Sequence, residues 1–434
     1  SGATLYYLTG KHNKEELRHR DAFIVVTFSW LIVALFGTLP YILSGTFHSF
    51  TDAYFESMAG FTTTGSSVLN DIEAVPMGIL FWRSLTQWIG GMGIILFALA
   101  ILPMLGTGGM QIFKAEVPEI SVDKLKPRIV DTAKALWFIY IGFTSVAAAS
   151  FLAEGMDLYN ALCHAFTTMA TGGFSTKNAS ISAFNSPLIE VTTSIFMLLA
   201  GINYTLYFYV FRGRISRLWK STEFKFYITI TALATIMITL SIWRSSYNSI
   251  LDALRHAFFQ VTSIMTTTGF ATANFENWSS FAQILLIILM FFGGMIGSTG
   301  GGIKQVRILL ILKQGYREMY QLIHPRAVTT VKLDEKLLSK EILGSIWGFM
   351  FLFIFVFVIA TLGMAAVGTD VITSATTVIS AMCNVGPALG SAGPAENYAA
   401  IPYIGKWILV FCMLTGRLEI YTVLILFVPQ FWKK

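Results

Sequence analysis

Phe61-Thr62-Thr63-Thr64-Gly65 is the stretch that decides the fold, because three more tripeptides that end in glycine occupy matching positions along the 434 residues. The four glycine-ending tripeptides are Thr63-Thr64-Gly65, Ala170-Thr171-Gly172, Thr267-Thr268-Gly269 and Asn384-Val385-Gly386. Their glycines lie 107, 97 and 117 residues apart. One Thr-Thr-Gly is an ordinary turn sequence, but four copies at matching positions predict four equivalent structural units.

The composition indicates a chain that lies in a membrane. Hydrophobic residues make up 55% of the sequence and charged residues 12%, and the mean hydropathy is +0.65, whereas soluble domains carry about 25% charged residues. Apolar windows of membrane-spanning length predict eight spans, at 22–43, 77–104, 133–153, 187–211, 225–243, 281–312, 341–367 and 404–428.

Shorter segments lie between the two spans of each pair and end at the tripeptides. They cover 52–64, 157–171, 252–268 and 370–385. Since a full span needs about 17–25 residues, we interpret them as re-entrant pore helices. Each begins with an acid, namely Asp52, Asp157, Asp252 or Asp370. An Asp at a helix start caps free N–H groups and suits the positive end of the helix dipole, which leaves the negative end pointing inward at a cation.

The basic residues predict the orientation. Of the 30 Lys and Arg residues, 24 fall in five segments: Lys11 to Arg20, Lys114 to Lys134, Arg212 to Lys225, Lys304 to Lys340, and Lys433 with Lys434. Basic loops stay on the cytoplasmic side, so the glycine tripeptides are expected to face outside. The net charge of +6 therefore reflects membrane topology and gives no reason to expect nucleic-acid binding.

These patterns predict an all-α polytopic membrane protein built from four pseudo-repeats. Each repeat holds an outer helix, a re-entrant pore helix with a filter loop, and an inner helix, and the four surround a central pore. The expected boundaries are 1–113, 114–220, 221–330 and 331–434.

The tripeptides predict a filter for monovalent cations. Irregular backbone at membrane depth is tolerated where it lines a cavity or is buried in protein, and glycine lets the chain turn its carbonyls inward. A ring of neutral oxygens replaces the water shell of an ion such as K⁺, whereas divalent-cation filters use rings of Asp or Glu. We therefore expect K⁺ at the twelve tripeptide residues.

The fourth tripeptide departs from the others, because Val385 replaces Thr, Asn384 precedes it and Pro387 follows the glycine. The ring is therefore asymmetric, and each strand holds one glycine where the potassium-channel signature has two. We expect the preference for K⁺ over Na⁺ to be less strict than in channels with four identical strands.

The sixth predicted span contains a run of ten residues, 293–302, with six glycines. Glycine weakens a helix by about 1 kcal/mol relative to Ala, so this run predicts a non-helical loop below the filter that acts as a gate. Two alternatives are a close-packing face of small residues and a phosphate-binding loop, although the Gly-Lys-Ser/Thr ending of the latter is missing. The glycines are Gly293, Gly294, Gly297, Gly300, Gly301 and Gly302.

Arg417 lies alone in the middle of the last span. A charged side chain there costs about 2.5–3.5 kcal/mol on insertion scales and normally faces the bundle interior or an aqueous cavity. It is expected either to form an electrostatic barrier to cations or to join an ion pair, with Glu419 or with an acid from another unit.

Other residue classes give little sign of catalysis, a cofactor or a metal centre. The six His show no metal spacing, and three Cys, at 163, 383 and 412, imply no disulfide framework. An intramembrane enzyme would need a catalytic pair, for which Arg417 with Glu419 and His164 or His256 are the embedded candidates. We expect no enzyme and no cofactor.

Several motifs together resemble the superfamily of potassium transporters that contains bacterial Trk and Ktr and plant HKT proteins. They are Phe61-Thr-Thr-Thr-Gly65, Gln87-Trp-Ile-Gly-Gly-Met-Gly-Ile94, Thr171-Gly-Gly-Phe-Ser-Thr176, Gly297-Ser-Thr-Gly-Gly-Gly-Ile-Lys304, His324-Pro-Arg-Ala-Val328 and Gly416-Arg-Leu-Glu419. The resemblance covers essentially the whole chain. It implies K⁺ uptake at the bacterial inner membrane, a homodimer, and a cytoplasmic nucleotide-binding regulatory subunit of the TrkA-like kind.

By position, the resemblance assigns the filter to the four tripeptides, the intramembrane loop to 293–302 and the pore-facing cation to Arg417. Members usually carry an extra pair of helices before the first repeat, and this sequence starts with a short basic lead. We therefore expect channel-like K⁺ conduction, with Na⁺ and Rb⁺ as candidate competitors. The alternative is a symporter that couples K⁺ to H⁺ or Na⁺.

Overall fold

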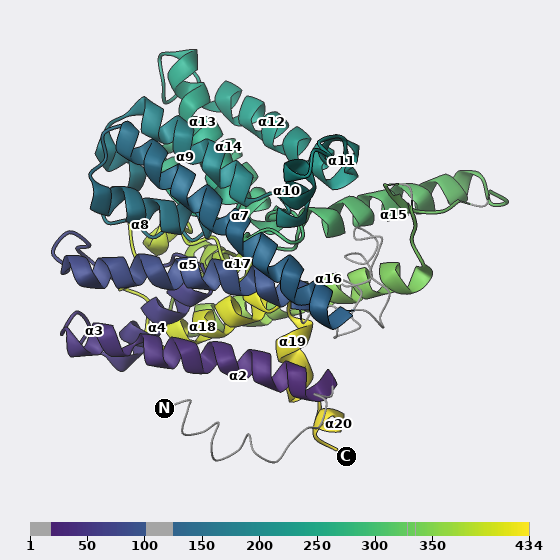
Figure 1. Cartoon of the computed structure of the whole chain (residues 1–434), viewed down its shortest axis with the longest axis horizontal. Coiled ribbons are helices and arrows are strands. Elements are labelled where there is room, and N and C mark those ends of the chain that lie inside the picture. The colour runs from purple at the N-terminus through teal and green to yellow at the C-terminus, as the bar shows by residue number, and fades with distance from the viewer. Residues whose placement is uncertain (1–18, 101–124, 328, 335, 434) are drawn as a thin grey trace.

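The computed structural model describes residues 19–100, 125–327, 329–334 and 336–433 (Figure 1). Within these ranges it is mostly helical, and β1 (Lys332–Leu333) and β2 (Lys336–Leu337) form an antiparallel hairpin. Five of the described helices are long and apolar enough to cross a membrane, or seven if each of two bent pairs forms one span. Large apolar side chains such as Phe138 and Phe351 point outward. The chain is a polytopic membrane protein, as the composition predicts.

The same order of helices occurs four times. The first unit holds α2 (His19–Gly37), α3 (Leu39–Leu43), α4 (Phe50–Phe61) and α5 (Met77–Ala100). The second holds α7 (Leu125–Ala153), α8 (Leu158–Met169), η3 (Ser180–Phe184), α9 (Pro187–Ala200), α10 (Tyr204–Phe211) and α11 (Ser216–Lys220). The third holds α12 (Thr222–Ile242), α13 (Ile250–Met265), η4 (Phe275–Asn277), α14 (Ser280–Phe292) and α15 (Gln305–Ile323). The fourth holds α16 (Lys340–Ala366), α17 (Val371–Cys383), η5 (Gly390–Ala392), α18 (Tyr403–Arg417), α19 (Tyr421–Leu424), η6 (Ile425–Phe427) and α20 (Pro429–Trp432).

The four short helices α4, α8, α13 and α17 form the inner ring of the molecule. They have 12, 12, 16 and 13 residues, too few to cross a bilayer of about 30 Å, which confirms the predicted re-entrant segments. Each packs against the inner helix of the preceding unit, in the pairs α5 with α8, α9 with α13 and α14 with α17. The pair α18 with α4 closes the ring.

The acids at the starts of the pore helices have two different roles. Asp157 and Asp370 are N-caps whose carboxylates accept backbone N–H groups of the first turn, as predicted. Asp52 and Asp252 are instead the third residues of α4 and α13, so the capping role predicted for them is wrong. These two helices start earlier than the sequence suggests. Asp52 accepts a hydrogen bond of 2.7 Å from Lys406 Nζ, which joins the first and fourth units.

The inner helices of the last three units are broken, and the sequence predicted only one of these breaks. The windows 187–211 and 404–428, expected as straight spans, are bent pairs with angles of 95° and 113°. The third inner helix is interrupted between Phe292 and Gln305, where the glycine run predicts a loop. Among these four inner helices, the first, α5, is one continuous helix over its described residues.

Protein groups replace the helical hydrogen bonds that the breaks remove. The carbonyl oxygen of Gly201 accepts from the N–H of Met295 at 2.9 Å, and Tyr204 N–H donates to Gly297 O at 3.1 Å. A lipid environment offers no such partners, so the breaks of the second and third units stabilise each other. The predicted boundary at residues 113–114 lies outside the described residues.

Candidate ion pathway

Each pore helix ends in a strand with the same backbone conformation. A residue with left-handed φ follows the helix end, and a glycine with positive φ comes two residues later. The pairs are Thr63 (52°) with Gly65 (80°), Thr171 (52°) with Gly173 (77°), Thr267 (60°) with Gly269 (86°), and Asn384 (55°) with Gly386 (106°). The equivalent strands, here called the filter strands, are therefore 63–65, 171–173, 267–269 and 384–386.

The second filter strand begins one residue later than predicted. Ala170 has φ −75° and ψ −9° and still belongs to the helix end, so it is not equivalent to Thr63. Gly173, which the tripeptide Ala170-Thr171-Gly172 leaves out, takes the place of Gly65. Because Gly172 and Gly173 are adjacent, the sequence alone does not show which of them is equivalent to Gly65. The Phe that follows the glycine in both the second and third units, Phe174 and Phe270, was the signal that gives the correct alignment.

The four filter strands touch one another in a closed ring. A methyl group added to any of their positive-φ glycines would collide with a backbone carbonyl oxygen of the next strand. The close contacts are between Gly65 and Gly172 O, Gly173 and Thr268 O, Gly269 and Val385 O, and Gly386 and Thr64 O. The last contact returns to the first strand, so the strands surround one common axis.

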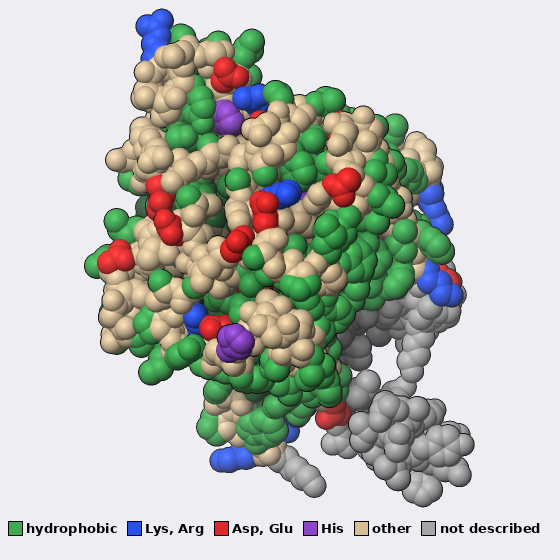
Figure 2. All heavy atoms as spheres, turned by 90° about the vertical axis from the view of Figure 1, so that its left-hand side faces the viewer, with side chains coloured by type: hydrophobic (Ala, Val, Ile, Leu, Met, Phe, Trp, Pro, Cys, Tyr) green, Lys and Arg blue, Asp and Glu red, His purple; other side chains and the backbone are tan. Residues whose placement is uncertain are grey.

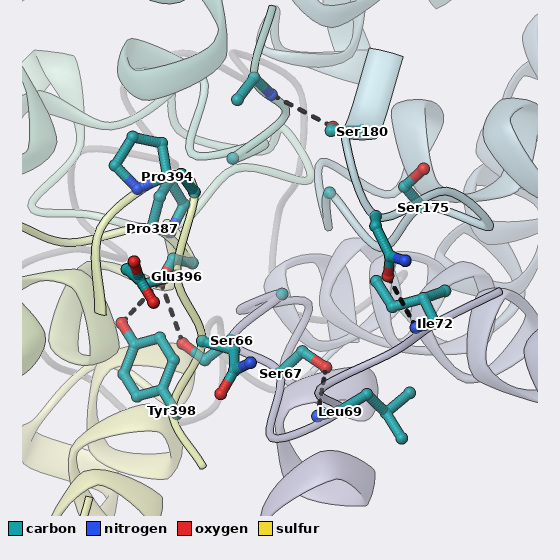
Figure 3. Close-up of a pocket in the computed structure, with 18 of the residues that line it drawn as sticks. Ser66, Ser67, Leu69, Ile72, Ser175, Ser180, Pro387, Pro394, Glu396 and Tyr398 are labelled. Carbon is teal, nitrogen blue, oxygen red and sulfur yellow. Dashed lines mark hydrogen bonds between the residues drawn. The ribbon is translucent and has the colours of Figure 1, made fainter. Parts of the chain in front are cut away.

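The same four glycines line a single cavity of about 170 Å³ at the mouth of this ring (Figure 3). Polar side chains including Asn70, Asn178 and Glu396 also line it. Figure 2 shows the side of the molecule that lies on the left in Figure 1, and acidic side chains lie around the centre of that side. No cluster of three or more His, Cys, Asp or Glu suited to a metal occurs among the described residues, so the ring offers mainly backbone and hydroxyl oxygens.

The fourth filter strand is held differently from the others, in line with the asymmetry of its sequence. Its Gly386 carbonyl oxygen accepts hydrogen bonds from the Tyr398 hydroxyl at 2.7 Å and from the Ser66 hydroxyl at 3.2 Å (Figure 3). A carbonyl oxygen has two lone pairs, and these two donors engage both. Ser66 belongs to the first unit, so the bond also joins the first and fourth filter strands.

A buried ion pair clamps together the segments that directly follow the first and second filter strands. Arg83 Nε lies 2.6 Å from Glu56 Oε1, with both side chains at most 2% exposed. Glu56 accepts from Ser67 Oγ and from Val68 N–H, each at 2.9 Å. Arg83 also donates to Ser175 O at 2.9 Å in the second unit. This pair was not predicted from the sequence, although two opposite charges in neighbouring membrane segments are a recognisable signal.

The glycine run forms a non-helical loop directly below the filter strands, as predicted. Gly301 N–H donates to Thr267 Oγ1 at 2.7 Å. Thr299 Oγ1 lies within hydrogen-bond reach of Met169 O at 3.1 Å and of Ala200 O. A methyl group on Gly301 would collide with Cys383 O in the fourth unit. The loop therefore contacts three units at once, and its small residues permit this close approach.

Arg417 lies beside the loop and is 2% exposed. Its Nη1 donates to Thr299 O at 2.8 Å and its Nη2 to Gly90 O at 3.3 Å, while Nε has no hydrogen-bond partner within the described ranges. Glu419 pairs instead with Arg307 at 2.5 Å, so the ion pair predicted between Arg417 and Glu419 is wrong. The guanidinium is held by backbone carbonyls.

Comparison with known proteins agrees with this architecture. Residues 2–434 match the model of the TrkH family, described as cation transport protein. The chain is 44% identical to the Trk system potassium uptake protein TrkH of Halomonas elongata, over 99% of this chain and 89% of that protein. The TrkH of Escherichia coli K12 is 42% identical, over 100% of this chain and 90% of that protein. The crystal structure of the potassium transporter TrkH from Vibrio parahaemolyticus superposes with a TM-score of 0.90 at 40% identity, covering 100% of this chain and 90% of that chain. The chain therefore belongs to the TrkH family of cation transport proteins.

Proposed function

We propose that this protein takes up K⁺ across the bacterial inner membrane through a channel-like pore whose selectivity filter is the ring of four filter strands. The observation that carries the proposal is the closed ring of carbonyl contacts, with all four glycines lining one cavity. The relatives from Halomonas elongata and Escherichia coli are potassium uptake proteins, which supports K⁺ as the transported ion.

An entering ion loses its water at the filter and gains protein oxygens in exchange. The carbonyl oxygens of Thr64, Gly172, Thr268 and Val385 lie against the neighbouring glycines and form one layer of ligands. Neutral oxygens of this kind suit K⁺, because they replace a weakly held hydration shell without binding the ion too tightly to leave.

The loop at 293–302 and Arg417 form the gate of this pathway. A buried positive charge repels a cation by about 2 kcal/mol at 8 Å for an effective dielectric constant of about 20. Arg417 is hydrogen-bonded to Thr299 of the loop, so a displacement of the loop also changes the position of the charge. Helix α15 begins directly after the loop and carries Lys313 and Arg317. Movement of α15 therefore transmits a signal from the cytoplasmic face.

The regulatory signal comes from a TrkA-like nucleotide-binding subunit that contacts the basic cytoplasmic face, and the protein acts as a homodimer. The filter faces outside. Mixing the protein with such a subunit and measuring K⁺ flux with and without nucleotide tests the regulatory part of the proposal. A K⁺ flux that is the same with and without the bound subunit and nucleotide would contradict the regulatory part of the proposal.

Tracer flux into liposomes tests the conducting function. The purified protein is expected to admit ⁸⁶Rb⁺ down its own gradient, with competition strongest from K⁺ and weaker from Na⁺ and Li⁺. Gly65→Ala should abolish this flux, because the added methyl group meets Gly172 O, whereas Gly142→Ala, where no atom lies within 4 Å, should leave it unchanged. Flux that requires an H⁺ or Na⁺ gradient would identify a coupled symporter and overturn the channel proposal.

A further inference from the structure

The second filter strand lacks a side chain at one position where the other three have one. Gly172 stands where the first, third and fourth strands carry Thr64, Thr268 and Val385. The space beside it is filled by Gln87, a fully buried residue of α5 in the first unit. A methyl group on Gly172 would lie against the amide of Gln87, with Nε2 at 2.8 Å and the other amide atoms closer still.

Both ends of the Gln87 amide are bonded to the second filter strand. Nε2 donates to Gly172 O at 2.6 Å, and Oε1 accepts from Phe174 N–H at 3.1 Å. The amide thus bridges the strand on either side of Gly173. Because glycine has the greatest backbone freedom of all residues, a strand with two adjacent glycines needs such a bridge more than the other three do.

The hydrogen bond from Gln87 also distinguishes one oxygen within its layer. Hydrogen bonds from the described residues do not reach the carbonyl oxygens of Thr64, Thr268 or Val385, whereas Gly172 O has this close donor. A donor that shares the lone pairs of a carbonyl weakens its field at an ion. Since the number and field strength of the carbonyl dipoles contribute to K⁺/Na⁺ discrimination, a weaker field favours the larger, less tightly hydrated K⁺.

We propose that Gln87 is a specificity-determining positioning residue, which replaces the missing side chain of the second filter strand and shifts the filter toward K⁺. The inference rests on the proposed function, since it presumes that the ring conducts ions. Loss of the amide releases the strand and strengthens the field of Gly172 O, and both changes favour Na⁺.

Gln87→Leu tests this role, because it keeps the size of the side chain and removes the amide. In liposomes the variant is expected to retain ⁸⁶Rb⁺ flux and to lose K⁺/Na⁺ selectivity by about fivefold or more, the effect of one lost buried hydrogen bond. The matched control is Gln283→Leu, which removes amide donors to Glu276 O and Trp278 O outside the filter and should leave selectivity unchanged. Unaltered selectivity in Gln87→Leu with intact flux overturns the inference. Absence of K⁺ flux in the parent protein would overturn the proposed function instead.

A rescue experiment tests the same idea without depending on the folding of Gln87→Leu. Gly172→Thr alone should block flux, because the new side chain meets the Gln87 amide. Combined with Gln87→Ala, it gives the second strand the Thr-Thr-Gly sequence of the first and third and removes the collision. Flux of ⁸⁶Rb⁺ should therefore return, with K⁺/Na⁺ selectivity reduced as in Gln87→Leu because the amide donor is absent. Normal flux in Gly172→Thr, or a double variant no better than that single variant, would show that the two residues do not share one space and one role.

Discussion

Arg417 Nη1 donates a 2.8 Å hydrogen bond to the carbonyl oxygen of Thr299, a residue 118 positions earlier in the chain. The bond joins the end of the last inner helix to the centre of the glycine loop. A second bond, from Nη2 to Gly90 O at 3.3 Å, extends the link to α5. One buried cation therefore connects the loop to two inner helices.

Replacing Arg417 by Ala should open the pathway. The variant removes both a repulsive charge and the bonds that hold the loop, so K⁺ flux in liposomes is expected to rise about tenfold or more, the change produced by about 1.4 kcal/mol. Its dependence on the regulatory subunit should weaken. Arg244→Gln, at an exposed site after α12 and outside the five basic segments, is the control. Unchanged flux together with unchanged dependence on the subunit would remove Arg417 from the gate.

Thr299→Val should loosen the loop without altering the filter. The side chain loses its hydroxyl, which is shared between Met169 O and Ala200 O, but Thr299 O remains available to Arg417. A lost hydrogen bond of about 1 kcal/mol predicts about a fivefold rise in the open fraction, measured by single-channel recording. Thr235→Val is the control, since its buried hydroxyl has no hydrogen-bond partner in the described part of the chain. A lower open probability in Thr299→Val would contradict a gating role for the loop.

The sequence predicts those features of this fold that depend on local patterns. The short segments before the glycine tripeptides and the glycine run at 293–302 are readable without tertiary contacts, and the structure confirms both. Of the eight predicted apolar spans, five are single helices long and apolar enough to cross a membrane and two more are bent pairs within the described residues. The bends after Ala200 and Arg417 were missed, because apolar helices of ordinary composition continue through them. Their stability depends on distant partners such as Met295, whose N–H bonds Gly201 O.

The sequence predicted which types of residue form the candidate site, but it did not predict the contacts between them. Four glycine tripeptides indicate a filter, yet the register of the second strand depends on backbone angles at Thr171 and Gly173. The pair of Glu56 with Arg83 and the amide bridge of Gln87 join residues that are 27 and 85 positions apart. Such contacts depend on how distant segments pack together, and the sequence of one segment carries no information about this packing.

The ion pair behind the first filter strand should dominate the stability of the outer pore. Glu56→Gln or Arg83→Met leaves an unpaired buried charge, so each variant is expected to lose about 3–5 kcal/mol of unfolding free energy. The double variant should lose less than the sum of the two. Lys177→Met is the control, because its pair with Glu73 is 35% and 47% exposed and such surface pairs contribute about 0–1 kcal/mol. Thermal unfolding in detergent measures all four, and additive losses would contradict the clamp.

Acidification should weaken the link between the outer loops of the first two units. The hydrogen bond from Asn178 Nδ2 to Asp71, at 2.8 Å, lowers the pKa of the Asp71 carboxyl below its usual value. A lowered pKa stabilises the folded state above the unfolded pKa, and this stabilisation is lost as pH falls through the folded pKa. Unfolding measured from pH 5 downward should show this loss in the parent and less of it in Asp71→Asn. If the parent and Asp71→Asn lose stability identically as the pH falls, the hydrogen bond from Asn178 to Asp71 does not stabilise the outer loops.

The most direct test of the central claim is an anomalous diffraction map from crystals grown with Rb⁺ or Tl⁺. Ordered ions are predicted on the common axis, between the filter strands that contain Gly65, Gly173, Gly269 and Gly386. A map with no ion at that ring, or with ions ordered only away from the axis, would contradict the carbonyl filter as the path of the cation.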